Sequence, residues 1–444
     1  MRNILIVGGG LSGLEFALAL QRHGECEITI LEWGCDERVL HEKDDSSHHA
    51  DDRRIRPWRS LGSGWGPGTG LKRRLGGRSL CWHGVVLPIE SYALARWPPV
   101  WQQLLTKEGL YQLVTRRLRQ QYPAVSPGEV TAAAYGLAAV PQAVSTLPRE
   151  RVDETATRHS VYSPLHALDL SRVTLIMGAR VNRVRRSSGA VLVDYTTSAG
   201  LQSQKADLCV LACGAIENAR IYADSIGETF ETKVTDHFCV GAVSRLSGAG
   251  AGLGEGQLIG YTQWADLRSN VFVQEQVSLS PTGARAIVDA WALVEQDREH
   301  GSLVQISPAA SAGAFGSVTI QANISPEDRR RLLSVSRGLH DFTNRYPGAD
   351  VAVGNLELQQ EPAALEEVVT GVSDRAHYYI PLGAVDHEAG TLPMGETVGE
   401  NLELTHMRGV YVLGASVFPA SGAANPSLTV LCLSNWLARH VSEM

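Results

Sequence analysis

The chain has 444 residues, of which 44% are hydrophobic and 20% are charged, and its formal net charge is −7. A chain of this length exceeds what one simple core accommodates, so we expect two domains with ample buried surface. The mild negative charge, without a basic run backed by aromatic residues, argues against a nucleic-acid partner.

No charged segment followed by an apolar one precedes the first predicted strand, and no stretch approaches the length of a membrane-spanning helix. We therefore expect a cytoplasmic protein without a membrane partner. The seven cysteines, an odd number, lack paired metal-ligand spacing and are typical of reduced, mostly buried thiols. Cys209 and Cys213 are four residues apart, but an apolar strand and its turn contain them, which indicates core packing.

The N-terminal segment combines an apolar run with closely spaced glycines. Gly8, Gly10 and Gly13 follow a predicted strand directly, and residues 11–24 predict an amphipathic helix closed by a glycine. Backbone N–H groups of such a turn approach a pyrophosphate, and the helix N-terminus favours its negative charge. A second predicted strand ends at Glu32, where an acid holds the ribose hydroxyls of a dinucleotide. The alternative is an ordinary glycine turn without a ligand.

Two segments of different composition follow. Residues 35–60 are polar, charged and without periodicity, which predicts a surface loop. Because its histidines and aspartates lack ligand spacing on a regular element, a solvated loop is favoured over a metal site. Residues 60–86 are dense in glycine and contain Arg73, Arg74 and Arg78. Such a segment can lie flat against a bulky planar ligand and donate N–H groups to it.

The middle of the chain predicts helices first and strands later. Residues 91–160 show apolar positions mainly at helical spacing, and residues 173–197 alternate as a hairpin or meander does. Residues 205–225 predict a strand, a tight glycine turn and a helix. Residues 231–380 predict short strands with one helix at 325–346.

The chain ends with a predicted strand at residues 409–416, a loop, and a helix from Pro426 to His440. Dinucleotide-type elements thus occur at the start, in the middle and at the end of the chain. We therefore predict an α/β protein whose nucleotide-binding domain is discontinuous. This domain comprises residues 1–90, 161–230 and 384–444, and an inserted α+β substrate or cap domain comprises residues 91–160 and 231–383.

Several segments of the sequence match motifs of one enzyme family. GGGLSG with Glu32 resembles its phosphate and ribose site, GGRSLCWHG its second glycine motif, and ADLCVLACGAIENAR its strand and turn beside the diphosphate. TDHF around His237 resembles a short Asp-His element. DHEAGTLPMG and GVYVLGASVFPASGAANPSLTV resemble the closing signature nearly element by element. The sequence therefore resembles the glucose–methanol–choline (GMC) oxidoreductases, and the resemblance extends over the whole chain.

The resemblance implies an FAD cofactor. Gly414 stands where family members often carry Asp, so we expect a backbone contact there, and Cys81 stands where some relatives carry a His bonded covalently to the flavin. A buried free thiol is favoured at Cys81, which implies non-covalent FAD. Beyond TDHF, the cap shows no motif of the family that would indicate the substrate. The implied FAD contacts are Gly8, Gly10, Leu11, Ser12, Gly13, Glu32, Gly76, Gly77, Arg78, Ser79, Trp82, His83, Gly84, Val181, Ala212, Cys213, Gly214, Gly414, Ala415, Asn425 and Pro426.

The resemblance also implies a catalytic pair in the closing signature. His387 is the expected base, because a neutral imidazole accepts a proton near the working pH, and Asn425 is expected to hold the substrate oxygen. Alternatively, His387 binds backbone, and Asn425 is an N-cap with Pro426 as the first helical residue. The positive end of that helix would face the pyrimidine edge of the flavin. We expect His83 and His237 to be structural or to line the site.

These features together predict an FAD-dependent oxidoreductase with a Rossmann-like domain. We expect it to dehydrogenate a hydroxyl group of a small alcohol, polyol or sugar, with oxygen or another acceptor reoxidising the flavin. A non-redox flavoprotein lyase and a scaffold that keeps FAD for structure only are the alternatives. The sequence contains no signal for an oligomeric state. Four aromatic residues are candidates for a sugar pocket or for the core: Trp65, Trp82, Trp264 and Tyr261.

Overall fold

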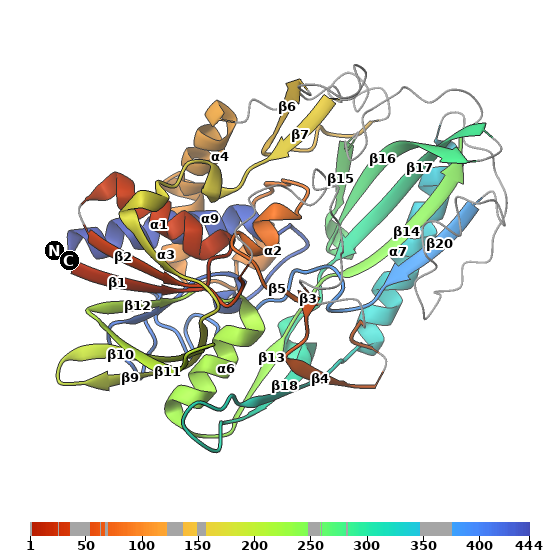
Figure 1. Ribbon diagram of the computed structural model, residues 1–444. Coiled ribbons are helices and arrows are strands. Elements are labelled where there is room, and N and C mark those ends of the chain that lie inside the picture. The colour runs from red at the N-terminus through yellow and green to blue at the C-terminus, as the bar shows by residue number, and fades with distance from the viewer. Residues whose placement is uncertain are drawn as a thin grey trace.

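The computed structural model forms two halves that meet along a shared boundary (Figure 1). A parallel sheet lies at the centre of one half, and a large antiparallel sheet forms the other. Most of the charged segment that predicts a surface loop, with its three histidines, lies outside the described residues. The structure describes residues 2–24, 26–35, 54–62, 64–66, 70–121, 136–148, 157–246, 258, 260–280, 283–346 and 375–444.

The parallel sheet is built from three distant parts of the chain. The strand order is β21 (Val410–Val412), β12 (Leu208–Leu211), β1 (Arg2–Val7), β2 (Cys26–Leu31) and β8 (Val173–Ile176). Strands β12 and β21 and the last four residues of β1 and β2 are buried, mainly apolar runs, as expected when both faces of a parallel sheet are covered, whereas the edge strand β8 is partly exposed. This arrangement confirms the predicted α/β class and the strands on either side of the first glycine turn.

Three helices follow these strands. Helix α1 (Leu11–His23) packs against the last helix, α9 (Ser427–Glu443), and α6 (Ala215–Ile226) follows β12 directly. Helix α1 ends at Gly24, whose N–H bonds to the Leu20 carbonyl, as the sequence predicts. The strand, glycine turn and helix predicted for residues 205–225 are likewise confirmed.

The region predicted as a hairpin or meander divides between two sheets. Its first strand, β8, joins the parallel sheet beside β2. The rest forms an antiparallel meander with the strand order β11, β10, β9. The prediction is therefore confirmed for the meander, whose strands are β9 (Arg180–Ser187), β10 (Ala190–Thr197) and β11 (Gly200–Ala206).

In the described residues of the segment predicted as mainly helical, 91–160, the helices lie between Ser91 and Gln121. The second part contains an antiparallel pair, β6 (Val144–Pro148) with β7 (Thr157–Val161), so the prediction is wrong there. The pairing of two segments overrides the weak local pattern in each. The helices are α2 (Ser91–Leu94), α3 (Pro99–Gln102), a π-helical turn (Gln103–Lys107) and α4 (Leu110–Gln121).

Helix α4 packs on the parallel-sheet half, although the sequence analysis places it in the cap. The Arg117 guanidinium lies 2.6 Å from the Glu15 carboxylate on α1 and donates to Asn435 Oδ1 on α9. The Tyr111 hydroxyl bonds to the Thr429 hydroxyl at 2.8 Å. These contacts join α4 to the two helices that cover the parallel sheet.

The antiparallel half has a five-stranded sheet with one long helix on one of its faces. Helix α7 (Pro326–Arg345) begins at a capping box formed by Ser325 and Asp328, and it packs on β14 and β17 (Figure 1). Successive side chains of β17 point to opposite faces of the sheet, and those of Val288, Ala290 and Ala292 are fully buried. The strand order is β15 (Gly260–Trp264), β16 (Ser269–Ser280), β17 (Gly283–Val294), β14 (Phe238–Arg245) and β20 (Arg375–Ile380).

A four-stranded sheet continues this half and takes one strand from the N-terminal part of the chain. Strand β4 (Trp58–Leu61) runs parallel to β19 (Ser317–Gln321), and β18 (Ser302–Ser307) separates β19 from β13 (Phe230–Val234). Near β4, the short strands β3 (Arg54–Ile55) and β5 (Leu71–Lys72) pair with each other. Within the described ranges, no helix combines the length and apolarity that a membrane crossing requires.

Candidate active site

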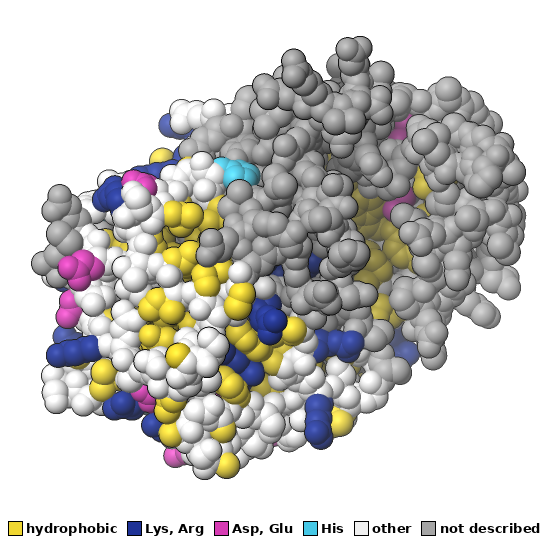
Figure 2. Space-filling view, in the orientation of Figure 1, with side chains coloured by type: hydrophobic (Ala, Val, Ile, Leu, Met, Phe, Trp, Pro, Cys, Tyr) yellow, Lys and Arg dark blue, Asp and Glu magenta, His cyan; other side chains and the backbone are white. Residues whose placement is uncertain are grey.

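A cavity of about 670 Å³ lies where the two halves meet. One wall is the carboxyl edge of the parallel sheet, which is where ligands bind in open α/β sheets. The other wall is the face of the antiparallel sheet opposite α7. Figure 2 shows hydrophobic side chains, with Lys and Arg side chains beside them, near the boundary between the two halves.

Three glycine turns at the ends of β1, β12 and β21 line this cavity. Gly8 has φ +103°, and a Cβ on it would lie 2.6 Å from the Ala212 carbonyl oxygen of the neighbouring turn. A Cβ on Gly10 or Gly214 would meet no protein atom within 4 Å. Position 8 therefore requires glycine so that the first turn can pack against the turn at Ala212. Gly10 and Gly214 instead leave open space beside the cavity.

The N-termini of three helices face the same cavity. The N-cap residues of α1, α6 and α9 are Gly10, Gly214 and Pro426, and all three line it. No side chain caps any of these helices. Their free N–H groups and the positive ends of their dipoles therefore favour an anionic ligand.

The Glu32 carboxylate lines the cavity beside the first turn. It accepts the Gly9 N–H at 2.8 Å and the Gly34 N–H at 2.6 Å. Burial raises the pKa of Glu32 to about 7, and the two N–H donors act in the opposite direction. Glu32 thus fixes the turn and presents its carboxylate at the expected ribose position.

Asn218, which the sequence analysis did not single out, holds two of the glycine turns together. Its Oδ1 accepts the Cys213 N–H, and its Nδ2 donates to the Leu413 carbonyl at 3.1 Å and to Ser416 Oγ at 3.0 Å. The side chain is fully buried on α6. It ties the turn after β12 to the turn after β21, so α6 positions both.

A second group that sequence reasoning missed lies at the Glu32 end of the cavity. The Arg180 guanidinium carbon lies 4.0 Å from the centre of the Trp33 ring and 3.9 Å from that of Phe315. Arg180 also pairs with Glu217 at 3.1 Å, and the Val181 carbonyl accepts from Arg220. The spacing of these residues in the sequence gives no signal that they meet.

The second glycine motif is joined to the loop that carries His387. The Arg78 guanidinium binds both oxygens of the Glu388 carboxylate and lies 3.2 Å from Asp386 Oδ1. Cys81 follows on the cavity wall, with Sγ 3.4 Å from the Arg78 carbonyl oxygen. Among the aromatic candidates named from the sequence, Trp82 lines the cavity, and its Nε1 donates to the Tyr162 carbonyl.

Most of the predicted FAD contacts lie on the cavity wall, and four do not. Gly13, Gly76, Ser79 and Gly84 serve the packing behind the wall instead. A Cβ on Gly13 would lie 2.1 Å from the Gly8 carbonyl oxygen, and the buried Ser79 hydroxyl donates to the Gly76 carbonyl. The predicted residues on the wall are Gly8, Gly10, Leu11, Ser12, Glu32, Gly77, Arg78, Trp82, His83, Val181, Ala212, Cys213, Gly214, Gly414, Ala415, Asn425 and Pro426.

His387 and Asn425 meet on the cavity wall. Asn425 Nδ2 lies 3.3 Å from His387 Nε2, and the buried Asn425 Oδ1 has no hydrogen-bond partner among the described residues. The N-cap alternative for Asn425 is wrong, because Pro426 is the N-cap residue and no side chain caps the helix. The amide therefore offers its oxygen to a ligand.

His237 contacts His387 and fixes its tautomer. The two Nδ1 atoms lie 2.8 Å apart, and His237 Nε2 lies 2.8 Å from the Gly422 carbonyl oxygen. A carbonyl only accepts, so we assign the His237 proton to Nε2, which leaves its Nδ1 to accept. His387 then carries its proton on Nδ1, and its Nε2 lone pair faces Asn425.

Burial keeps both rings neutral. It lowers the pKa of His237 to about 4, and it lowers the pKa of His387 well below its usual value, with His237 and Arg78 acting in the same direction. The Asp236 carboxylate accepts the backbone N–H of both histidines and that of Gly383. It therefore holds the two loops in register.

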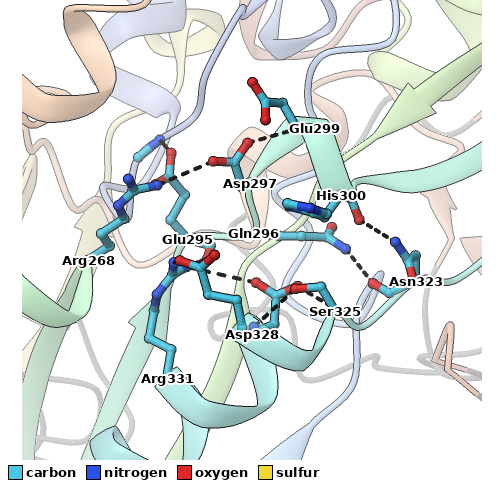
Figure 3. Close-up of polar contacts among 12 residues, drawn as sticks. Arg268, Glu295, Gln296, Asp297, Glu299, His300, Asn323, Ser325, Asp328 and Arg331 are labelled. Atoms are coloured by element: carbon cyan, nitrogen blue, oxygen red, sulfur yellow. Dashed lines mark hydrogen bonds and ion pairs between the residues drawn. The ribbon is translucent and has the colours of Figure 1, made fainter.

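A polar network around Glu295 and Gln296 supports the backbone of Asp236 and Gly422 (Figure 3). Gln296 Oε1 accepts the Asp236 N–H at 3.2 Å, and its Nε2 donates to the Asn323 carbonyl. Glu295 accepts the Gly422 N–H at 3.2 Å and pairs with Arg268. The network thus fixes the carbonyl that orients His237 and the aspartate that orients both loops.

A comparison with known protein families finds a match for the segment that contains His387 and Asn425. Residues 302–434 match the family described as GMC oxidoreductase, and they include His387, Asn425 and the third glycine turn. This C-terminal part of the chain is therefore similar to the GMC oxidoreductases. The GMC match does not include the first glycine turn or His237, and no curated protein matches the sequence.

The fold of the whole chain is similar to that of a solved structure. Pyridoxine 4-oxidase from Mesorbium loti is similar over 100% of both chains, with a TM-score of 0.66 and 17% identity. At this identity the similarity concerns the fold, and it includes both halves. The Rossmann-like domain with an inserted cap that the GMC resemblance implies is therefore confirmed.

Proposed function

We propose that this chain binds FAD non-covalently in the cavity and oxidises a CH–OH group of a small alcohol. The observation that carries the proposal is the 3.3 Å contact between Asn425 Nδ2 and His387 Nε2 on the cavity wall. In this contact the Asn425 Nδ2–H donates to the lone pair of the base, which a substrate hydroxyl would take over, and the amide Oδ1 has no partner among the described residues. Such a pair can bind one hydroxyl group from two sides.

The residues on the parallel-sheet wall fit FAD. The open space at Gly10 and Gly214 and the three uncapped helix N-termini suit a diphosphate. Glu32 suits the ribose hydroxyls, and Trp33 with Arg180 offers a flat surface for the adenine. The N-terminus of α9, near Asn425, favours negative charge on the flavin ring.

His387 is the proposed base, and the protein prepares it for proton transfer. The hydroxyl proton of the substrate passes to Nε2, while FAD, when bound, supplies the acceptor for the hydride and its two electrons. The imidazolium that forms keeps its Nδ1–H bond to His237. Asn425 orients the hydroxyl, since its Nδ2–H can donate to the substrate oxygen while the O–H points toward His387 Nε2.

The proposed substrate is a small alcohol, polyol or sugar-like compound. The solved structure with the similar fold is of a pyridoxine oxidase, so pyridoxine belongs in the panel of candidates. The second substrate is oxygen or another electron acceptor. Cys81 lies on the wall, but its Sγ already contacts the Arg78 carbonyl, which supports non-covalent binding.

The test is anaerobic stopped-flow mixing of the purified yellow protein with sugars, polyols, aromatic alcohols and pyridoxine. Loss of the visible flavin absorption with at least one alcohol is the expected result, and air then restores it if oxygen is the acceptor. Product formation with an unchanged spectrum would favour a lyase. A colourless protein that takes up no FAD would end the proposal.

A further inference from the structure

The cavity face of the antiparallel sheet carries its side chains in ordered rows. Phe272 on β16 pairs with Trp291 on β17, which pairs with Gly241 on β14, which pairs with Tyr378 on β20. A Cβ on Gly241 would lie 2.2 Å from the Tyr378 ring, so the glycine makes room for the ring. The Phe272 and Trp291 rings stack with centroids 5.9 Å apart. This row, the aromatic row, forms a flat apolar wall.

A polar row lies next to the aromatic row, farther from the histidines. Gln274 pairs with Asp289, and both side chains line the cavity. Asp289 is 5% exposed, and its Oδ1 accepts the Tyr378 hydroxyl at 3.0 Å. In the described part of the chain, Asp289 makes no ion pair with Lys, Arg or His.

A buried carboxyl without a cationic partner is costly unless a ligand compensates it. Burial raises the pKa of Asp289 to about 7, and the Tyr378 hydroxyl offsets this only in part. Neither the sheet nor its packing on α7 requires an acid at this position, because the side chain points away from the helix into the cavity. The position therefore suits a ligand that brings its own positive charge.

The strand register gives the approximate distance between Asp289 and the histidines of the proposed reaction site. Cys239, two residues beyond His237, pairs with Leu293, and Asp289 lies four residues farther along β17. Four strand residues extend about 13 Å. A molecule that touches His387 and Asp289 at once is therefore elongated, and the aromatic row lies along its middle.

We propose that Asp289 binds a cationic group, an ammonium or a protonated ring nitrogen, at the far end of an elongated, largely apolar alcohol. This inference rests on the proposed function for the hydroxyl end and adds the specificity of the other end. Asp289 and Gln274 supply the acceptors for N–H donors, and Phe272 and Trp291 contact the apolar middle.

The test compares ω-amino-1-alkanols with 1-alkanols of equal length, from six to twelve carbons. The measured quantity is the ratio of kcat/KM for the amine to that for the alkanol, which cancels general losses of activity. In the wild type we expect this ratio to rise with chain length. In Asp289→Asn we expect it to be roughly 10- to 100-fold lower than in the wild type. Asp289→Glu should retain part of the preference, and Tyr378→Phe should retain it because the ring and the carboxylate remain.

A second measurement does not depend on turnover. Decylamine, which has no hydroxyl group, is titrated into the purified protein by calorimetry. Titration of decylamine into buffer alone is the blank. Tight binding by the wild type and weakening by at least roughly tenfold in Asp289→Asn support the inference. Equal binding by both proteins, or an amine-to-alkanol ratio that Asp289→Asn leaves unchanged, overturns it. If no alcohol reduces the flavin while decylamine binding still depends on Asp289, the proposed function fails and the site stands.

Discussion

The Nδ1 atoms of His237 and His387 lie 2.8 Å apart, and the Gly422 carbonyl decides which of them holds the proton. Because that carbonyl requires a donor, His237 presents its Nδ1 lone pair to His387. The Nε2 atom of His387 is thereby unprotonated and can accept a proton. A main-chain carbonyl thus sets the protonation pattern of the proposed base through an intervening imidazole.

Replacement of His237 should slow flavin reduction without removing FAD. His237→Phe abolishes the acceptor for His387 Nδ1–H, and we expect the reduction rate constant to fall roughly 10- to 100-fold. His237→Gln keeps one acceptor and one donor on the same side chain and should retain most of the rate. Anaerobic stopped-flow spectroscopy measures both. Equal rates for the Phe variant and the wild type would contradict the tautomer assignment.

Removal of the proposed base should have a larger effect. His387→Ala should lower the reduction rate constant by roughly 10²- to 10⁴-fold while the FAD content stays near that of the wild type. His300→Ala is the matched control, because this histidine is exposed on the cap surface. A His387→Ala protein that reduces its flavin as fast as the control would exclude the histidine as the base.

The rate of reduction should stay high in mildly acidic solution. The pKa of His387 is well below its usual value because of burial and the nearby His237 and Arg78, so the ring remains the neutral acceptor as the pH falls. We expect a flat profile from pH 8 to about 6.5 and a decline only below it. Stopped-flow rates across this range provide the measurement, and a midpoint at or above 6.5 would contradict it.

Stability should depend on pH through His237. The unfolded ring titrates near 6.5 and the folded ring near 4, so the unfolded state binds more protons between these values. The free energy of unfolding should therefore fall as the pH falls through this window, by about 3 kcal/mol from this group. Urea unfolding of the wild type and His237→Gln isolates the contribution, since other groups cancel in the difference. Parallel curves for the two proteins would refute the prediction.

Two glycines of the first turn should respond differently to a methyl group. Gly8→Ala forces a side chain into φ +103° and against the Ala212 carbonyl, so we expect about 1–3 kcal/mol of lost stability even without FAD. Gly10→Ala has φ −88° and open space, so the apoprotein should keep its stability and lose FAD affinity. Urea unfolding and the FAD content of the purified proteins separate the two effects. A destabilised Gly10→Ala apoprotein would contradict this account.

The sequence predicts the elements that local patterns specify. The strand, turn and helix around Gly10, the Glu32 position and the segment from β12 to α6 are each confirmed because their signals lie within a few residues. The closing signature likewise predicts that His387 and Asn425 act together, and their side chains lie 3.3 Å apart. The hairpin of β6 and β7 was missed because its pairing outweighs a weak local pattern.

Contacts across the fold could not be read from the sequence. His237 and His387 are 150 residues apart, and nothing near either predicts that their rings meet. Asp289 and Trp291 face the cavity only through the register of five strands, which the sequence pattern leaves undetermined. Asn425 departs from the N-cap expectation because its amide contacts His387 and the helix begins without a side-chain cap.

The parallel sheet takes one of its two edge strands, β21, from the last tenth of the given sequence. During translation the ribosome therefore delivers the first glycine turn long before its partner turn and Asn425. A prematurely released polypeptide lacks one side of the cavity, whatever else it has folded. The proposed FAD site is thus complete only after β21 and Asn425 have been synthesised.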